Sequence, residues 1–264
     1  MLAAISEIRG IDPGIGGYKL WLMLCDVFGK GWMPGRDKFM RFLSKNRLLG
    51  KRPKRRHTTN SNHRYHKWKN LVKDFVPTAA NQLWVSDITY IDTDSGCCYL
   101  HLVTDAYSHK IIGWTLAASL GAVFSLNALE MAIVQTGRTD LAGLIHHSDR
   151  GVQYCCDMYV EELQGHNISI SMTEDYKPTD NAIAERVNGT IKTERVYVQE
   201  HRFKDLGEAR KSIAEFIDFY NNRRPHMSIG MQPPSAAHQQ HGEQKKYWRK
   251  KIYSQNANYV PTNA

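Results

Sequence analysis

The order of strand-like and helix-like patterns after residue 80 most constrains the fold of this chain. Three stretches rich in Val, Ile, Tyr and Trp come first, "QLWVSDITYI", "CCYLHLVTDAY" and "KIIGWTLAA", and the turn residues "DTDSG" separate the first two. These features predict a three-stranded antiparallel meander. The helical stretch "AVFSLNALEMAIVQTG", a fourth strand in "LAGLIHHS", a short helix in "MYVEELQGHN" and a fifth strand in "ISISM" follow. This order predicts an α/β fold in which helices pack on a mixed five-stranded sheet.

The helices of this region have predicted core stripes and caps. In the first, a buried stripe is expected at Phe124, Ala128, Met131 and Val134. A helix from about residue 182 to 198 follows the fifth strand, with Thr179, Asp180 or Asn181 as its N-cap. The last long helix, "DLGEARKSIAEFIDFYNNRR", ends before Pro225, and its predicted buried stripe comprises Leu206, Ala209, Ile213, Phe216, Ile217 and Tyr220.

Residues 1–50 predict a small helical module. The first helix, "YKLWLMLCDVF", has apolar residues at helical spacing, namely Leu20, Leu22, Leu24, Val27 and Phe28. The turn "GKGWMPG" separates it from "RDKFMRFLSKNRLLG", which Gly50 is expected to end. Basic residues on this second helix suit a helix-turn-helix that contacts nucleic acid: Lys38, Arg41, Lys45 and Arg47. Any helical hairpin with a polar face has the same pattern, so both interpretations stay open.

The net charge of +9 is concentrated in two segments. In "KRPKRRHTTNSNHRYHKWK", from Lys51 to Lys69, eight of nineteen residues are Lys or Arg and none is acidic. Such a segment suits a phosphate backbone, although a solvated linker has the same composition. The residues of this segment that we expect to contact DNA are Lys51, Arg52, Lys54, Arg55 and Arg56. A second basic cluster, "KKYWRKK", lies in an irregular tail over residues 241–264.

Several classes of protein are disfavoured by composition. The five cysteines include two adjacent pairs and match neither a disulfide framework nor a zinc pattern. No apolar segment is long enough to span a bilayer, and the N-terminus "MLAAISEIRGID" lacks the charged and apolar regions of a secretory signal. We therefore expect a cytosolic protein that reaches DNA directly.

Three acids have positions that suit a metal centre. Asp87 lies in the middle of the first predicted strand, Asp149 follows the fourth, and Glu185 lies in a predicted helix with thirty-five residues between it and Asp149. Hard divalent cations such as Mg²⁺ prefer carboxylate oxygens. If the two strands and the helix converge, the three carboxylates could hold a pair of ions against a phosphodiester.

Each acid also has an ordinary structural interpretation. Asp149 is placed like a cap, Glu185 like a solvated helix residue, and Asp105 ends the second strand as a rival first acid. Asp87 is preferred because apolar residues flank it, so that burial of its charge would be costly without a function.

Three basic side chains lie near these acids in the sequence. His147 and Arg150 flank Asp149 and could contact phosphate or support the acid by hydrogen bonds. Lys192 follows Glu185 by seven residues, nearly on one helical face and roughly 10 Å along the axis. This spacing would allow Lys192 to contact DNA while Glu185 reaches a metal.

Five segments carry a family resemblance: "WVSDITYI", "VTDAYSHKIIGW", "HHSDRGVQY", "DNAIAERVNGTIKTE" and "FYNNRRPHMSIGMQPPSA". Together they resemble the catalytic region of the insertion-sequence transposases of the IS-three group, relatives of retroviral integrases, over about residues 75–240. The resemblance implies a ribonuclease-H-like fold and a catalytic, metal-binding triad of Asp87, Asp149 and Glu185. It also implies Mg²⁺ as cofactor, in two ions for which Mn²⁺ can substitute, and a DNA contact through Lys192.

The expected organisation follows from these observations: a helix-turn-helix-like module at 1–50, a basic linker or arm at 51–74, an integrase-type catalytic core at 75–240 and a basic tail at 241–264. The resemblance implies a downstream-frame product that acts as a homo-oligomer on element ends and target DNA, with an upstream-frame product as a further partner. The expected reaction is metal-dependent strand cleavage and transfer of the 3′-hydroxyl. The alternatives are a ribonuclease-H-like nuclease without strand transfer and a non-catalytic DNA-binding regulator.

Overall fold

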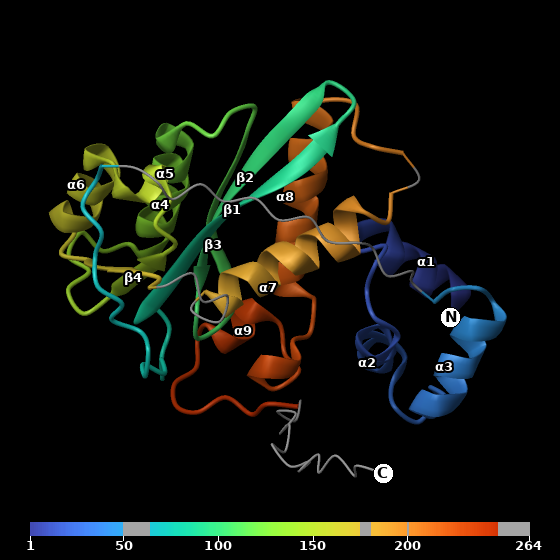
Figure 1. Cartoon of the computed structure of the whole chain (residues 1–264). Coiled ribbons are helices and arrows are strands. Elements are labelled where there is room, and N and C mark those ends of the chain that lie inside the picture. Colours follow the sequence, from blue (N-terminus) through green and yellow to red (C-terminus); the bar gives the residue numbers. More distant parts are fainter. Residues whose placement is uncertain (50–63, 175–180, 200, 248–264) are drawn as a thin grey trace, which may run out of the picture.

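A central five-stranded sheet organises the computed structural model, which describes residues 1–49, 64–174, 181–199 and 201–247 (Figure 1). Its strands are β1 (Leu83–Thr93), β2 (Gly96–Asp105), β3 (Ile111–Ala117), β4 (Ile145–Ser148) and β5 (Ser169–Met172), in the order β3-β2-β1-β4-β5. The pairs β1–β2 and β2–β3 are antiparallel, whereas β1–β4 and β4–β5 are parallel. This topology confirms the mixed sheet that the sequence predicts.

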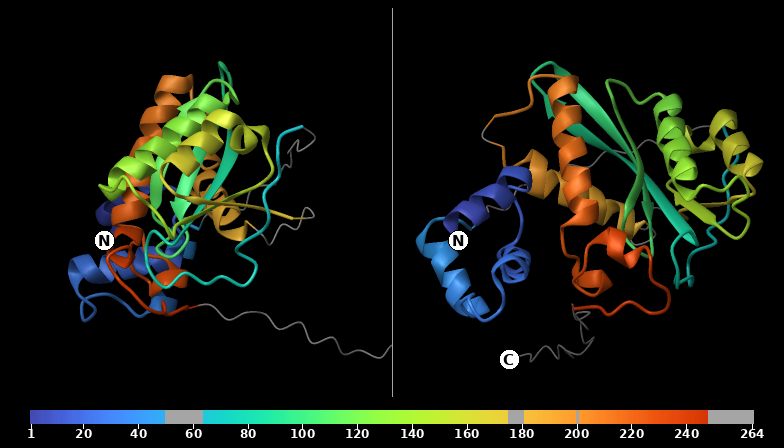
Figure 2. Two further views of the ribbon diagram at one scale, coloured as in Figure 1. Left: turned by 90° about the vertical axis from the view of Figure 1, so that its left-hand side faces the viewer. Right: turned by 180° about the vertical axis from the view of Figure 1, so that it is seen from behind.

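Helices cover both faces of the sheet. The first face packs against α4 (Ala122–Thr136), α5 (Val152–Cys155) and α6 (Asp157–Gly165), and the opposite face against α7 (Ala182–Ile191) and α8 (Leu206–Asn222), as Figures 1 and 2 show. Successive side chains of a strand point to opposite faces of the sheet, so the strands contribute to a hydrophobic core on each face. Trp84 lies in the core on the α4 side, whereas Ile91 and Leu100 lie in the core on the α8 side. Within the described ranges, no helix combines the length and apolar character needed to cross a membrane.

The predicted buried stripe of α4 is wrong. Met131 and Val134 are 39% and 77% exposed, and the buried face comprises Ser125, Ala128, Leu129, Ala132 and Ile133. The reason is close packing: a Cβ on Gly113 of β3 would collide with the carbonyl oxygen of Ala128. The sheet therefore requires the small-residue face of α4, which apolar periodicity does not distinguish from the larger one.

Three helices make up the N-terminal region, α1 (Leu2–Ile11), α2 (Gly17–Phe28) and α3 (Arg36–Lys45). The sequence interpretation lacked α1. It also extended the third helix to Gly50, which lies outside the described residues; α3 ends at Lys45, where the Asn46 side chain donates to the carbonyl of Phe42 and Arg47 has a left-handed φ of 54°. Residues 29–35 connect α2 and α3, a longer connection than the three- or four-residue turn of a helix-turn-helix.

The core of this N-terminal region is also shifted from the predicted one. Leu20 and Leu24 are buried as expected, together with Met23 and Cys25, but Val27 is 65% exposed. Phe28 is exposed too, and stacks on Trp32 at a centroid distance of 4.8 Å. The cluster also includes Phe219 of α8, so the N-terminal helices pack against the rest of the chain. Figures 1 and 2 show α1 beside the C-terminal end of α7.

The helix predicted over residues 182–198 has two parts. The α-helix α7 ends at Ile191, and the π-helix η1 (Lys192–Val196) continues it. Asn181 is the N-cap residue, as predicted, but its side chain donates to the carbonyl of Ser86 and makes no capping hydrogen bond. The other two cap candidates, Thr179 and Asp180, lie outside the described residues.

The last long helix agrees with its predicted stripe: Ala209, Ile213, Phe216, Ile217 and Tyr220 are buried and Leu206 packs against them. In the segment predicted to be irregular, η2 (Met227–Ile229) and α9 (Pro234–Ala237) form short helices.

The start of the basic tail is held to the core, because the Gly242 amide donates to the carbonyl of Thr78. Likewise, the end of the predicted linker lies along β5, where the Leu71 amide donates to Ser171 Oγ at 2.9 Å.

A buried ionic cluster joins the N-terminal helices to the core. Arg224 donates through Nε and a terminal nitrogen to both carboxylate oxygens of Glu194, each at 2.6 Å. Lys19 Nζ lies 3.5 Å from Glu194, and Asp12 Oδ2 lies 3.9 Å from Arg224 Nε. Burial, followed by the charge of Glu194, raises the pKa of Asp12 well above its ordinary value. Ionisation of the buried Asp12 carboxyl beside Glu194 is thus unfavourable.

We expect Asp12→Asn to flatten the dependence of stability on pH. A carboxyl whose pKa is raised in the folded state stabilises fully below its unfolded pKa near 4, and this contribution falls as pH rises toward the raised value. The wild-type free energy of unfolding should therefore decrease between about pH 5 and pH 8, by up to about 1.4 kcal/mol per pH unit from this group. Urea unfolding across that range, with exposed Asp74→Asn as control, measures the slope; an unchanged slope in Asp12→Asn contradicts the assignment.

Candidate active site

The register of β1 and β4 aligns the first two acids. Trp84 pairs with His146 and Val85 with His147 in this parallel pair. The pairing ends two residues before Asp87 and Asp149, and the charge of Asp149 helps to raise the pKa of Asp87, so the two acids lie close together. Neighbouring strands lie about 4.8 Å apart, and paired residues point to one face of the sheet. The two acids, sixty-two positions apart in the sequence, are therefore neighbours because of the sheet topology.

Asp87 lies on the face of the sheet that α7 covers. Its Oδ2 accepts a hydrogen bond of 2.7 Å from Asn188 Nδ2, and its Oδ1 accepts from the Ile88 amide at 2.8 Å. Burial and then the charge of Asp149 raise the pKa of Asp87 to about 7, against the opposing effect of these hydrogen bonds; the charge of Glu185 contributes least. Negative charge thus accumulates around Asp87.

The turn after β4 orients Asp149. The Gly151 amide donates to Asp149 Oδ1 at 2.9 Å. A Cβ on Gly151 would stand only 2.9 Å from that same oxygen, so a larger residue would press on the carboxylate. The backbone of this turn therefore fixes the side chain of the second acid.

Helix α7 presents Glu185 on its exposed face, while Ala184, Val187 and Ile191 are buried. Two asparagine side chains tie this helix to β1: Asn181 Nδ2 donates to Ser86 O at 3.0 Å, and Asn188 Nδ2 donates to Asp87. Since residues three apart lie on adjacent turns of one helix side, Asn188 holds the turn next to Glu185 against the first acid. The third acid is thereby carried to the same part of the molecule.

The three carboxylates suit a hard cation by their chemistry, because oxygen ligands are those that Mg²⁺ prefers. Burial raises the pKa of Asp87 most, and the charges of Asp149 and Glu185 add to that effect. Among the described residues, however, no three His, Cys, Asp or Glu side chains are close enough together to hold one ion. The charge of Asp149 affects the pKa of Asp87 more than the charge of Glu185 does.

The rival acid, Asp105, has its oxygens engaged within the fold. Its Oδ1 accepts from the amide and hydroxyl of Ser108 at 2.8 and 2.7 Å, and its Oδ2 accepts from the Asn81 amide at 2.8 Å. Burial acts to raise its pKa, but hydrogen bonds from His238, Ser108 and the Asn81 amide outweigh burial and lower it. Asp105 therefore stabilises the loop after β2.

The basic residues that the sequence suggested as DNA contacts differ in their surroundings. His147 is fully buried and its Nδ1 hydrogen-bonds Ser171 Oγ at 2.8 Å, which fits the supporting role and not a phosphate contact. Lys192 begins η1; burial lowers its pKa, and the charges of Asp87 and Asp92 oppose this, so its ammonium lies near the first acid. Arg150 is partly buried next to Asp149. The five predicted arm contacts, Lys51, Arg52, Lys54, Arg55 and Arg56, lie outside the described residues.

Sequence interpretation missed the residues that support the acids. Asn188 carries no signal of its own, because its partner Asp87 is 101 positions away. His146 Nε2 lies 2.7 Å from Ser86 Oγ and 2.9 Å from Tyr159 Oη, a buried link between β4, β1 and α6. Ser86, next to Asp87, and His146, three residues before Asp149, are thus hydrogen-bonded. This bond holds β1 and β4 together beside the site.

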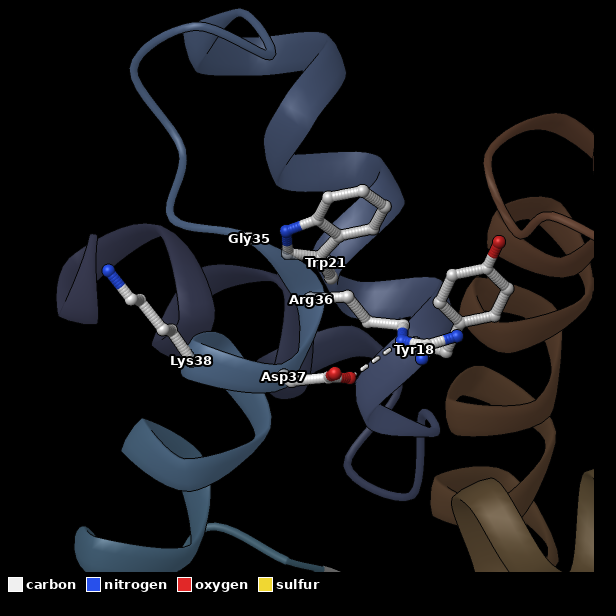
Figure 3. A pocket seen from close by; sticks show the side chains of 6 residues that line it. All are labelled: Tyr18, Trp21, Gly35, Arg36, Asp37 and Lys38. Carbon is white, nitrogen blue, oxygen red and sulfur yellow. Dashed lines mark hydrogen bonds and ion pairs between the residues drawn. The ribbon is translucent and has the colours of Figure 1, made fainter.

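A surface pocket of about 570 Å³ lies elsewhere, among the N-terminal helices. Its walls are Tyr18, Trp21, Gly35, Arg36, Asp37 and Lys38, and Figure 3 shows Arg36 paired with Asp37 beside the Tyr18 ring. No part of the acid site contributes to it, so this pocket does not explain the arrangement of the carboxylates.

Comparisons with known proteins agree with this architecture. Two family models described as "Integrase core domain" match residues 77–178 and 166–234. The putative transposase for insertion sequence element IS986/IS6110 of Mycobacterium tuberculosis is 35% identical over 236 residues, 87% of this chain and 84% of the relative. Transposase InsF for insertion sequence IS3A of Escherichia coli is 34% identical over 161 residues, 61% of this chain and 54% of that protein.

A solved structure supports the fold alone. The HTLV-2 integrase catalytic core domain, in complex with magnesium, superposes with a TM-score of 0.50 at 18% identity, covering 62% of this chain and 99% of that one. The ribonuclease-H-like fold is thus confirmed. Taken with the family matches and the long alignment to insertion-sequence relatives, the architecture shows that this chain belongs to the IS3-group transposases with an integrase-type core.

Proposed function

We propose that this chain cleaves DNA at the ends of an insertion sequence and transfers the freed 3′-hydroxyls to target DNA, with Asp87, Asp149 and Glu185 as its catalytic carboxylates. The observation that carries the proposal is the parallel pairing of β1 with β4, which runs up to Val85 and His147, two residues before Asp87 and Asp149, together with the charge of Asp149 acting on Asp87. Glu185 of α7 adds its charge to theirs. The three acids are far apart in sequence, and the charges of Asp149 and Glu185 both act on Asp87.

The three carboxylates would hold Mg²⁺, in two ions, with Mn²⁺ as a substitute. The chemistry that such ions would supply there is neutralisation of phosphodiester oxygens, activation of the attacking hydroxyl and stabilisation of the leaving oxygen. The protein supplies orientation: Asn188 fixes Asp87, and the Gly151 amide fixes Asp149. No side-chain nucleophile is required. Water attacks phosphorus and releases a 3′-hydroxyl, which then attacks a target phosphodiester and displaces another 3′-oxygen.

DNA is the proposed partner, both as element ends and as target. The charge of Asp87 acts on Lys192, and Arg150 follows Asp149 directly, which supports a proposed contact of both with a phosphate backbone. We further propose contacts by the basic arm and by the exposed basic residues of α3. Because two element ends must be joined, the active form is a homo-oligomer on DNA, and an upstream-frame product is a further candidate partner. The proposed location is the cytoplasm, at the nucleoid when the protein is bound to DNA.

A joining assay tests the proposal. The full chain is incubated with a duplex of the element's own end that already carries a recessed 3′-hydroxyl, together with a supercoiled target plasmid, in Mg²⁺ or in EDTA. We expect Mg²⁺-dependent joining of the labelled end to the plasmid. Cleavage without joining would favour the ribonuclease-H-like nuclease, and metal-independent binding with neither product would favour the regulator; each result would overturn strand transfer.

A further inference from the structure

The N-terminal region contacts η1, which continues the helix that carries the third acid. We propose that residues 10–19, here called the docking segment, position α7 and thereby Glu185, so that the N-terminal region is a positioning part of the active site as well as an attached module. This inference rests on the proposed function, because it assigns a role to Glu185. It is supported by contacts from two adjacent residues of η1.

Arg195 makes the first set of contacts. This arginine is only 7% exposed, and its terminal nitrogen donates to the carbonyl oxygens of Gly10 and Ile11 at 3.0 and 2.7 Å. Those carbonyls belong to the last turn of α1, where the helix itself offers no donors. The same guanidinium donates to Ser212 Oγ and Glu215 of α8. Arg195 thus joins α1, η1 and α8 at one point.

Glu194 makes the second set. Its carbonyl oxygen accepts from the Gly14 amide at 2.8 Å, and its carboxylate accepts from Arg224 and lies 3.5 Å from Lys19 Nζ. The approach is close: a Cβ on Gly14 would collide with Glu194 Cα and stand 2.6 Å from the carbonyl oxygen of Thr193. The docking segment therefore fits against the backbone of η1 only with glycine at position 14.

The contacts reach the active site through one continuous helix. Residues 192–196 of η1 follow α7 without a break, and π-helical turns occur frequently at functional sites. Asp87 and Asp149 are fixed by the sheet, whereas Glu185 depends on where α7 lies. Asn188 holds the middle of α7, and the docking segment holds its C-terminal continuation. A displacement of about 1 Å in catalytic geometry can cost on the order of 100-fold in rate.

The chain offers a matched pair of variants two residues apart. Gly14→Ala places a methyl group against the backbone of η1, whereas a Cβ on Gly16 has no heavy atom within 4 Å. Both glycines lie in the connection before α2, Gly16 as the N-cap residue of that helix. Only the first is expected to displace η1.

Two measurements on the full chain test the positioning role. In amide hydrogen exchange without metal or DNA, Gly14→Ala should exchange at least about tenfold faster over residues 186–196 than wild type, while β1 and β2 stay unchanged. In the joining assay, kcat should fall at least about tenfold with little change in the KM for DNA, the signature of displaced catalytic geometry. Gly16→Ala should match wild type in both.

The outcomes separate the two proposals. Wild-type exchange and kcat in Gly14→Ala overturn the positioning role, as does an equal loss in Gly16→Ala. If wild type itself joins no DNA, the proposed function fails, and the exchange comparison still decides whether the docking segment holds α7. Should Gly14→Ala not fold, Lys19→Met, which removes only the 3.5 Å pair with Glu194, takes its place with smaller changes of the same kind expected; their absence overturns the proposal.

Discussion

Glu185→Gln is expected to abolish both nicking and joining while DNA binding stays largely intact. The substitution keeps the size of the side chain and removes the charge needed to hold a divalent cation. Glu185 is exposed on α7, so the fold has no need of its carboxylate. Loss of activity should exceed about 100-fold, since even residues that only support metal ligands are worth about 10–100-fold. Quantification of nicked and joined products at saturating Mg²⁺, with a gel-shift measurement of binding, checks this prediction.

Glu130→Gln provides the control, because Glu130 is likewise an exposed glutamate on a helix, α4, on the opposite face of the sheet. It should behave as wild type. Strand transfer retained in Glu185→Gln would remove this residue from the catalytic site, and parallel loss of DNA binding would show that the carboxylate acts otherwise than by metal binding.

Arg224→Met is expected to cause the largest loss of stability. Arg224 is 3% exposed, and it is the bidentate partner of Glu194 and a neighbour of Asp12. Removal of one partner from a buried ion pair leaves the other charge uncompensated, which typically costs about 3–5 kcal/mol. For a domain of this size, the midpoint of thermal unfolding should fall by roughly 10 °C. Urea and thermal unfolding at neutral pH measure both quantities.

Arg223→Met is the matched control. Arg223 is the residue before Arg224, but it is exposed, and its guanidinium lies 5.5 Å from the centre of the Phe219 ring. Its effect should stay below about 1 kcal/mol, the usual scale of an exposed cation–π contact. If the two variants lose equal stability, the buried cluster does not join the N-terminal helices to the core in the way that its distances indicate.

Local patterns predicted the fold to a considerable extent. Strand alternation and turn residues predicted all five strands, and the helical periods predicted α4, α6, α7 and α8, because these signals depend on neighbours within a few residues. Where such a signal is weak, prediction failed: α1 was missed, and the π-helical turn η1 has no periodic pattern of its own. The face of α4 was wrong because apolar side chains occur on more than one side of that helix.

The candidate acids could also be selected from sequence, since a charge within an apolar strand is costly without a purpose. Their supporting contacts could not. Asn188 meets Asp87 across 101 positions, and the Gly14 amide meets Glu194 across 180. Glycine and asparagine occur for many reasons, so residue type alone does not identify such a contact.

The sequence by itself determined the order of the elements, the mixed sheet and the identity of Asp87, Asp149 and Glu185 as candidate acids. Only the tertiary structure decided that β4 pairs with β1, with Val85 opposite His147, and that the segment before α2 contacts η1, the continuation of the helix of Glu185. The physical reason is range. Periodicity and turn chemistry act between near neighbours in the chain, whereas strand register and close backbone packing depend on how distant segments fill the same space.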